Sequence, residues 1–510
     1  MAAPVAGHVS DPSDPRARRT GLALLAILVL GAALRLHHFA EPSLWLDEYG
    51  TSWAVAADTY GGVVHRTLLA HNQSPFFYLL AKASTDLFGP GPAALRLPSI
   101  LLGIALVAVA FFLAGRLFRD PDAPWIAALV FALSERLVWY SQNGRSLALA
   151  LLCGTLSFLF YAGILRRDTT LGRVAWVVST AAAFYAHYLF GFVVVVQAVH
   201  LLWRRGREAA SRRSVVSALA LALAAAPGAW QFFQVVGRRR QLDWVGAQGW
   251  DHPLRMLLDF LDPLVFCAVG LGVLFVRAGR AAAAPQESDE ARPLRHVRLL
   301  ACWLLLPWPV FALLPPLFDT HLLYPRYLAL ALPAALLTLA WLLLQAPRGW
   351  PRRTVVAVFV LTAFAFNLLP AFEEHGVFAR RPREGWTESA QYLDLAARPD
   401  DLVLYTSGLV EADQVVGADP ELASYFGWPL LVHLKPELRG IVRNLPARRG
   451  PATEAYVAGL LEEASRHDRV WVAGRNAIVR AVGEGLVRQG FREADRRRFH
   501  QVDVYELRRR

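Results

Sequence analysis

The sequence predicts a polytopic α-helical membrane protein with a C-terminal soluble α/β domain, and three observations support this fold class. Hydrophobic residues make up 55% of the 510 residues and charged residues only 18%, a composition that a set of soluble domains does not have. Apolar runs near the length of a membrane-spanning helix recur up to residue 371. Beyond that point the charge rises, and short strand-like and helix-like segments alternate.

Eleven apolar stretches approach the length of about 20 residues that a helix needs to span the hydrocarbon. They lie at residues 20–38, 96–115, 123–140, 146–165, 173–188, 189–203, 214–236, 256–276, 299–318, 327–345 and 354–371. Ser134-Glu135-Arg136 interrupts the pair 123–165, and His187-Tyr188 interrupts the pair 173–203. Either pair could therefore form a short, a broken or a cavity-lining hairpin.

These spans divide the chain into three parts. Residues 1–19, rich in Pro, Asp and Arg, predict a disordered cytoplasmic N-terminus. The apolar run that follows has no small-residue cleavage site, so we expect a retained helix rather than a cleaved signal peptide. The multi-pass transmembrane region covers 20–371 and includes a long first outer loop at 39–95. An extracytoplasmic α/β domain is predicted at 372–510.

The orientation follows from the arginines and lysines. They concentrate in one set of alternate loops, with clusters at Arg16–Arg19, Arg204–Arg213 and Arg348–Arg353, and are sparser in the other set. Because loops rich in Lys and Arg stay in the cytoplasm, the N-terminus is predicted inside and, with an odd number of spans, the C-terminus outside. The net charge of +12 is then a topology signal, and no nucleic-acid partner is expected.

Two regions outside the spans have helical or strand-like patterns of their own. In the first outer loop, Ser52–Leu69 and Ser74–Phe88 have the spacing of helices that lie in the membrane interface. In the C-terminal domain the pattern predicts both strands and helices. The strands are expected at Asp401–Thr406, Leu430–Lys435, Arg469–Gly474 and Gln501–Leu507, and the helices at Glu388–Ala397 and Thr453–His467.

The first outer loop begins with Leu44-Trp45-Leu46-Asp47-Glu48, two acids among aromatic and apolar residues. Ionisable residues at membrane depth are functional candidates, and the predicted outer side also carries several cations. Acids and cations together suit glycosyl transfer from a lipid-linked phosphosugar. A carboxylate can take the proton of the attacking acceptor, and guanidinium or ammonium groups can stabilise the departing phosphate.

Four motifs carry a resemblance to a known family. They are Leu44–Glu48, His71–Tyr78, the run Val138–Arg145 that contains Tyr-Ser-Gln, and Tyr324-Pro325-Arg326-Tyr327. Together they resemble the integral-membrane glycosyltransferases of the GT-C fold, nearest to the protein O-mannosyltransferase and aminoarabinose transferase superfamily (glycosyltransferase family 39). The resemblance covers residues 20–371, and it implies a polyprenyl-phosphate-linked sugar as donor.

The resemblance also implies roles for single residues. Asp47 takes the role of catalytic base in an inverting displacement, and Glu48 that of an orienting or metal-binding neighbour. Arg145 and Arg326 match arginines expected to contact the donor phosphate, assisted by Lys82. The predicted substrate-binding set is completed by His71, His187 and Tyr327. A divalent metal ion stays open, because some relatives place one near the acids whereas the sequence shows no cluster of ligands.

Each candidate also has a plainer interpretation. The two acids could simply cap an interfacial helix, Arg145 and Arg326 could anchor at lipid headgroups, and Lys82 could extend from an interfacial helix to the headgroups. The histidines could be hydrogen-bonded packing residues. Asp47 and Glu48 are nevertheless the catalytic candidates, because they lie on the predicted outer side among aromatics.

The preferred function is a membrane glycosyltransferase at the outer face of the cytoplasmic membrane. Its expected partners are the donor, a lipid, glycan or protein acceptor, and membrane lipids. A transporter or flippase of a lipid-linked saccharide is the first alternative, but it predicts mid-helix charges and internal repeats, which the sequence does not show. A non-catalytic membrane scaffold is the second, and it would leave the first-loop acids dispensable.

Overall fold

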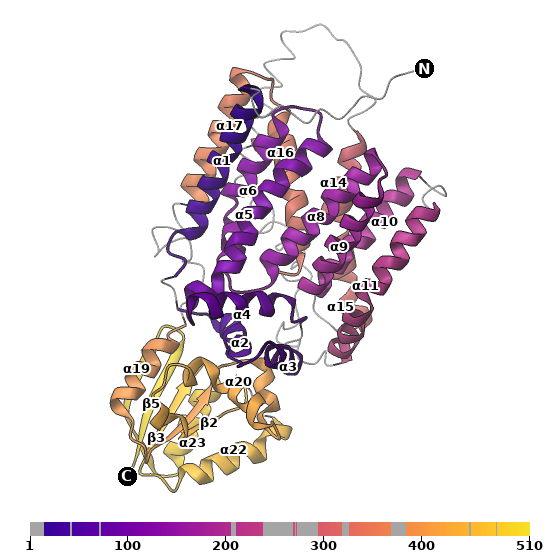
Figure 1. Ribbon diagram of the computed structural model, residues 1–510. Coiled ribbons are helices and arrows are strands. Elements are labelled where there is room, and N and C mark those ends of the chain that lie inside the picture. The colour runs from indigo at the N-terminus through magenta and orange to yellow at the C-terminus, as the bar shows by residue number, and fades with distance from the viewer. Residues whose placement is uncertain are drawn as a thin grey trace, which may run out of the picture.

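The computed structural model consists of a helical domain and a C-terminal α/β domain that meet at one end of the helical domain (Figure 1). The residues that the structure describes are 15–40, 43–70, 73–205, 211–237, 269–270, 272, 294–318, 326–368, 384–447, 450–475 and 477–510.

The helical domain is formed by long apolar helices joined by short connections. Its elements are α1 (Pro15–Leu36), α5 (Pro92–Leu117), α6 (Ala123–Leu133), α7 (Glu135–Ser141), α8 (Leu147–Arg166), α9 (Thr170–Ala186), η1 (Tyr188–Gly191), α10 (Phe192–Arg205), α11 (Arg212–Gly237), α14 (Leu294–Leu305), α15 (Pro307–Phe318), η4 (Leu328–Ala331), α16 (Leu332–Leu344), α17 (Trp350–Thr362) and η5 (Ala363–Leu368).

Helices overlie every predicted span except 256–276, most of which lies outside the described residues. By length and composition, three described helices could each cross a membrane: α5, α8 and the Arg212–Phe233 part of α11. The predicted interruption of 123–165 is real, because α6 ends at Leu133 and α7 starts two residues later. Ser134 begins α7 as an N-cap, with its Oγ accepting the N–H of Leu137 at 3.4 Å.

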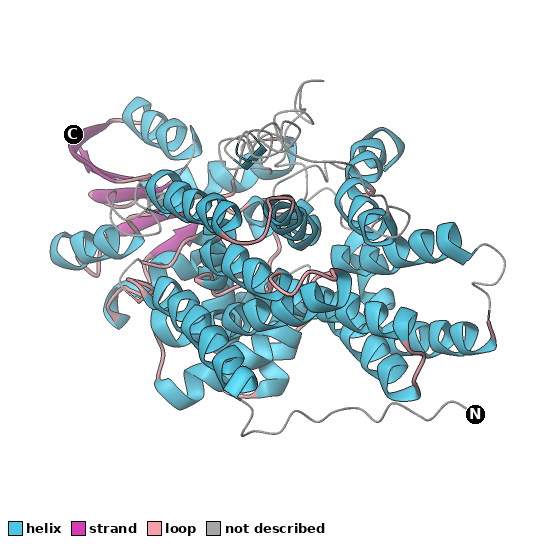
Figure 2. Ribbon diagram, turned by 90° about the horizontal axis from the view of Figure 1, so that it is seen from above, coloured by secondary structure: helices cyan, strands magenta, loops and turns pink. Residues whose placement is uncertain are grey.

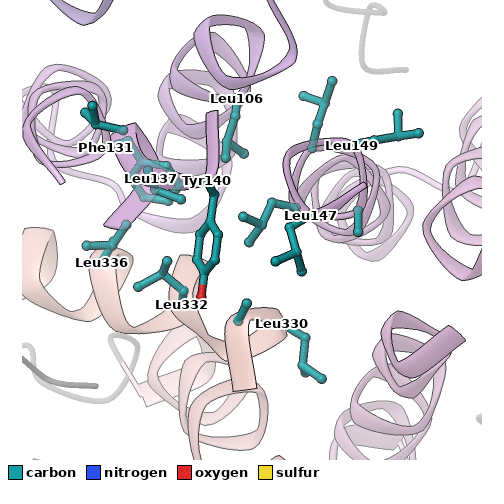
Figure 3. Packing of buried hydrophobic residues seen from close by; sticks show 14 of the residues in the cluster. Leu106, Phe131, Leu137, Tyr140, Leu147, Leu149, Leu330, Leu332 and Leu336 are labelled. Carbon is teal, nitrogen blue, oxygen red and sulfur yellow. The ribbon is translucent and has the colours of Figure 1, made fainter. Parts of the chain in front are cut away.

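The core of the helical domain fixes α7 in place. Leu106 of α5, Phe131 of α6, Leu147 of α8 and Leu336 of α16 are buried around Tyr140 of α7 (Figure 3). A short helix of seven residues is not stable by itself in water, so this packing supplies its stability. The segment that follows α7 therefore starts from a rigid position.

Three further helices form a platform between the two domains (Figure 1). They are α2 (Leu46–Val55), α3 (Tyr60–Ala70) and α4 (Phe76–Phe88). Sequence patterns predicted helices in this loop but joined the end of α2 to α3. The platform lies at the end of the helical domain where α5 begins, and we call this end the platform end.

The C-terminal domain holds all of the described strands (Figure 2). They form one sheet in the order β2-β1-β3-β5-β4, in which β1 pairs in parallel with β2 and β3, and β5 antiparallel with β3 and β4. The elements are α19 (Trp386–Ala396), β1 (Leu402–Thr406), η6 (Val410–Val415), α20 (Pro420–Leu431), α21 (Pro436–Arg439), β2 (Val442–Asn444), α22 (Pro451–Ala464), β3 (Arg469–Gly474), α23 (Ala477–Arg488), β4 (Phe491–Phe499) and β5 (Val502–Arg509).

One predicted strand is wrong. Residues 430–435 form the end of α20 and the turn after it, not a strand. The helix starts at Asp419, whose side chain accepts the N–H of Leu422 at 2.8 Å, and its last apolar residues pack inward instead of alternating between two faces.

The two domains share a hydrophobic core. Trp53 of α2 and Tyr78 of α4 are fully buried together with Tyr425 and Phe426 of α20. The indole N–H of Trp53 also donates to Ser424 Oγ at 2.9 Å. The platform is therefore packed on both sides, by the helical domain and by the C-terminal domain.

Candidate active site

Asp47 and Glu48 lie in the first turn of α2. Acidic side chains suit this position, because the N-terminus of a helix carries a partial positive charge. Their environments differ: the Asp47 side chain is 23% exposed, whereas that of Glu48 is completely buried. Of the two neighbouring acids, only Asp47 is therefore accessible to solvent.

Arg326, 279 positions further along the chain, meets Asp47. Its Nη1 donates to Asp47 Oδ2 at 2.7 Å, and its own side chain is 26% exposed. The guanidinium lies 5.7 Å from the ring centre of Tyr327, and that ring lies 6.2 Å from the ring of His187. Asp47, Arg326, Tyr327 and His187 therefore form one cluster. His187 Nδ1 is buried in it and hydrogen-bonds to no group within the described residues.

Arg145 joins the same cluster through the main chain of Asp47. Its Nη1 donates to the carbonyl oxygen of Asp47 at 3.1 Å and to the hydroxyl of Tyr78 at 3.2 Å, and lies 3.5 Å from Thr51 Oγ1. The carbonyl of Arg145 accepts a hydrogen bond from Ser99 at 3.2 Å. One guanidinium thus connects α2 and α4 and adds a second positive charge near Asp47.

Glu48 points away from this cluster, into a set of buried hydrogen bonds. Arg96, also fully buried, donates from Nε to Oε1 at 2.9 Å and from Nη2 to Oε2 at 2.6 Å. The N–H of Gly144 donates to Oε1 at 2.8 Å and that of Trp45 to Oε2 at 3.4 Å. With four donors on its carboxylate, Glu48 ties the start of α2 to the loop that carries Arg145.

Gly144 is required in that loop by close packing. A Cβ at this position would lie 3.0 Å from the Leu95 side chain and 3.2 Å from the Leu95 carbonyl oxygen. A larger residue would push the loop, and with it the N–H that reaches Glu48, away from α5.

A reciprocal pair of helix caps ties the same two segments together. Arg35, buried at the end of α1, donates to the carbonyls of Phe131 and Ala132 at 3.3 Å each, and these belong to the last turn of α6. In return, the amide of Gln142 donates to three carbonyls at the end of α1, including Arg35 O at 2.8 Å. Each side chain satisfies carbonyls that a helix end leaves without a partner. The helix that leads to Asp47 and the segment that leads to Arg145 are thereby fixed to each other.

Besides Glu48, two predicted residues are not brought into the cluster by a described contact. Lys82 pairs with Asp86 at 2.6 Å along α4, one helical turn beyond Tyr78. His71 lies outside the described residues. For a metal ion, no group of three His, Cys, Asp or Glu side chains with suitable geometry exists in the part of the chain that is described. Both acids of the motif are instead engaged by arginines.

Sequence analysis missed Tyr78 and Arg96. Tyr78 belongs to the motif run His71–Tyr78, but nothing in that run marks its hydroxyl as a partner of Arg145. Arg96 did carry a signal, because it is an ionisable residue at the start of a predicted span. Its partner Glu48 is 48 residues away, and only the fold shows the pairing.

The helical domain with this site at its platform end has the fold of the GT-C membrane glycosyltransferases. ArnT from Cupriavidus metallidurans in the apo state aligns with a TM-score of 0.52 at 13% identity, over 96% of this chain and 98% of that chain. The same protein bound to undecaprenyl phosphate gives 0.51 with the same identity and coverage. The arabinofuranosyltransferase AftD from Mycobacteria gives 0.52 at 15% identity, over 96% of this chain but 41% of that chain.

By sequence, the profile of the dolichyl-phosphate-mannose-protein mannosyltransferase family matches residues 72–230. That segment begins within the motif run His71–Tyr78 and includes Arg145 and His187. No curated protein matches the sequence. The profile and the shared fold confirm the predicted resemblance to GT-C membrane glycosyltransferases.

Proposed function

We propose that this protein is an integral-membrane glycosyltransferase that moves a sugar from a polyprenyl-phosphate donor to a lipid, glycan or protein acceptor. The observation that carries the proposal is the partly exposed cluster in which Asp47 meets Arg326 and Arg145. One carboxylate and two guanidinium groups are what a displacement of a phosphate leaving group needs: a base for the acceptor and cations for the departing oxygens.

In the proposed reaction, Asp47 is the general base. The acceptor oxygen or nitrogen attacks the anomeric carbon, its proton passes to Asp47, and the bond from that carbon to the phosphate oxygen breaks. The electron pair leaves with the polyprenyl phosphate. A single displacement inverts the anomeric centre, and it needs no covalent intermediate on the enzyme.

Arg326 and Arg145 bind the donor phosphate in this proposal. Arg326 holds Asp47 in the structure, and the two non-bridging oxygens of the donor's phosphodiester can replace that carboxylate on the guanidinium, with a bond that strengthens as charge develops on the leaving phosphate. Donor binding then draws Arg326 from Asp47 to the phosphate and frees the carboxylate for the acceptor. Arg145 keeps its bond to the carbonyl of Asp47 and supplies the second positive charge.

The remaining predicted residues receive supporting roles. Glu48 is a positioning residue. Its carboxylate is buried and already accepts four hydrogen bonds, so it is not accessible to a substrate. Tyr327 and His187 form a wall of the donor site beside Arg326. Lys82 and His71 are assigned to the lipid-phosphate side of the donor because of their positions in the sequence. His71 begins the motif run His71–Tyr78, and Lys82 follows that run one turn later in α4.

We place the site at the extracytoplasmic face of the cytoplasmic membrane. The platform end lies opposite the end of α5 that carries Arg116, and clusters of Arg flank that opposite end. The positive-inside rule assigns the Arg-rich end to the cytoplasm. The donor class is supported by the solved ArnT bound to undecaprenyl phosphate and by the family profile named for dolichyl-phosphate-mannose.

The proposal is tested by incubating the purified protein in lipid nanodiscs with a panel of polyprenyl-phospho-sugars, acceptor lipids, glycans and peptides. The wild type should transfer sugar, and Asp47→Asn should lower transfer at least ~100-fold with an unchanged unfolding temperature. Asp58→Asn is the matched control, because Asp58 is an exposed acid of the same loop. Transfer by the Asp47 variant at the wild-type rate would rule out Asp47 as the base.

The same preparation separates the transporter alternative. A flippase would move a fluorescent lipid-linked saccharide between leaflets without forming a glycosylated acceptor. Movement without product across the whole panel would reject the glycosyltransferase proposal.

A further inference from the structure

The C-terminal domain contacts α2 at the turn that carries Asp47. Glu384 stands at the start of this domain and is 2% exposed. Its carboxylate accepts hydrogen bonds from Arg475 and from the indole N–H of Trp386 at 3.0 Å, and the backbone N–H of Leu46 lies beside it. Leu46 is the first residue of α2, and just before that helix Ser43 Oγ donates to the main-chain carbonyl of Glu384 at 3.5 Å. A carboxylate of one domain thus lies at the start of the helix that carries the proposed base of the other.

Two buried carboxylates share this helix start. Glu384 lies beside the N–H of Leu46, and Glu48 accepts that of Trp45 at 3.4 Å. Both groups face N–H donors that a helix leaves without a partner, and both place negative charge at the positive end of the helix dipole. Asp47 follows directly after Leu46, so its position depends on both carboxylates.

The contacts continue along α2. The hydroxyl of Tyr49 lies 2.8 Å from Nε2 of His433, and Ser52 accepts the indole N–H of Trp428 at 3.2 Å. Burial raises the pKa of Tyr49, so its phenol keeps its proton and its hydroxyl shares a hydrogen bond with His433. On the next platform helix, Arg66 pairs with Glu421 at 2.9 Å. The C-terminal domain therefore contacts α2 at several residues along two helical turns.

We propose that the C-terminal domain is a working part of the catalytic site, and that Glu384 is a positioning residue that sets the place of Asp47 by holding the first turn of α2. This inference depends on the proposed glycosyl transfer only for the kinetic part of its test, because the hydrogen-exchange part needs no activity. A shift of about 1 Å at a reacting group can slow a reaction ~100-fold, so a small movement of α2 has a large effect on the chemical step. The donor phosphate, held by other residues, is little affected.

The C-terminal domain offers a matched control in Asp401. Asp401 is 4% exposed and, like Glu384, accepts from an arginine and a tryptophan: from Arg469 at 3.0 Å and from the indole of Trp471 at 2.9 Å. It lies before β1, at the end of the strands remote from Arg475. Asp401→Asn therefore removes the same kind of buried charge from the same domain without touching α2.

The experiment compares the full-length wild type with Glu384→Gln, Asp401→Asn and Tyr49→Phe in nanodiscs. Transfer kinetics are measured together with hydrogen exchange of the peptide that contains α2. Glu384→Gln should lower kcat about 10–100-fold, keep the donor KM within ~3-fold, and speed exchange in α2. Asp401→Asn should lower the unfolding temperature but keep kcat within ~3-fold and leave exchange in α2 as in the wild type.

Tyr49→Phe keeps the ring and removes the hydroxyl that bonds to His433, so it tests the contact should Glu384→Gln not fold. It should speed exchange in α2 and lower kcat ~2–5-fold. The inference is overturned if the loss of kcat simply follows the loss of unfolding temperature across all variants, Asp401→Asn included. It is also overturned if hydrogen exchange in α2 is the same as in the wild type in both Glu384→Gln and Tyr49→Phe. If the wild type transfers no sugar but α2 exchange responds as expected, the glycosyltransferase proposal fails and the positioning role of Glu384 stands.

Discussion

The two ends of the helical domain both carry clusters of acids and arginines, and they are built differently. At the end remote from the platform, Arg352 of α17 donates to Asp120 at 2.9 Å and to Asp122 at 2.6 Å. The same guanidinium donates to the carbonyls of Leu344 and Ala346 at 3.0 Å each, at the end of α16. This arginine is 8% exposed and holds a connection and a helix end together.

The platform end has two acid–arginine pairs: one is buried, like Arg352 at the remote end, and we call it the closed pair; the other is partly exposed, and we call it the open pair. Glu48 and Arg96 are both fully buried, whereas Asp47 and Arg326 are 23% and 26% exposed. Charge at the end of a span therefore does not by itself identify an active site. The open pair lies near His187, whose buried Nδ1 has no hydrogen-bond partner among the described residues, and it is here that we propose a substrate replaces a protein partner.

The closed pair at the platform end should have the largest effect on stability. Glu48→Gln leaves the buried guanidinium of Arg96 without its counter-charge, and breaking such a pair destabilises a protein by about 3–5 kcal/mol. A large fall in unfolding temperature, measured by differential scanning fluorimetry in detergent, should accompany loss of transfer. A Glu48→Gln protein with wild-type stability and no transfer would instead make Glu48 a catalytic residue.

The open pair should show the reverse pattern. Arg326→Gln should lower kcat/KM for the sugar donor about 100-fold, because the guanidinium that hydrogen-bonds to the phosphate is lost. Its unfolding temperature should change little, since an ion pair that is partly exposed to water contributes about 0–1 kcal/mol. Arg326→Lys, which keeps the charge but not the paired geometry, should recover part of the activity. An unchanged kcat/KM for the donor in both variants would remove Arg326 from the phosphate site.

The cluster at the remote end should matter for stability alone. Asp120→Asn weakens the Arg352 network, but Asp122 still binds the arginine, so a loss of about 1–2 kcal/mol is expected. The kcat for transfer, measured on the folded fraction, should stay within ~3-fold of the wild type. A larger fall in kcat would show that the remote end also takes part in the reaction.

The smallest expected effect concerns pH at the domain interface. Burial lowers the pKa of His433, with Glu388 of α19 acting in the opposite direction and Tyr49 of α2 as hydrogen-bond partner. As pH falls below about 6.5, an unfolded histidine takes up a proton that the buried one does not, so the contribution of His433 to stability is lost. The difference in unfolding temperature between wild type and His433→Gln should therefore shrink from pH 7.5 to pH 5. A difference that grows at low pH would contradict the assignment.

Sequence analysis located the acids and arginines of the site because charges beside apolar runs are conspicuous. It placed Asp47, Arg145 and Arg326 among the candidates, and the structure joins them although Asp47 and Arg326 are 279 positions apart. It also found the break between α6 and α7, since Ser134-Glu135 is a helix start within an apolar run. The resemblance gave Asp47 the role of base and Glu48 that of a neighbour, but the sequence could not show that Glu48 is buried and paired, because this depends on Arg96 and Gly144.

Other features had no local signal. Glu384 contacts Leu46 across more than three hundred positions, and nothing in its neighbourhood in the sequence suggests that contact. Strand β4 was missed because Phe491–Phe499 contains four arginines and lacks an apolar alternation. It is an edge strand, where charge prevents pairing with another chain, so its sequence reflects its exposure more than its conformation.

The comparison between the open and closed pairs is tested most directly by the rate of the chemical step with donor saturating. Single-turnover transfer should be at least ~100-fold slower in Asp47→Asn than in Asp120→Asn, although Asp120→Asn should be the less stable protein. Equal single-turnover rates in the two variants would contradict the assignment of Asp47 as the base.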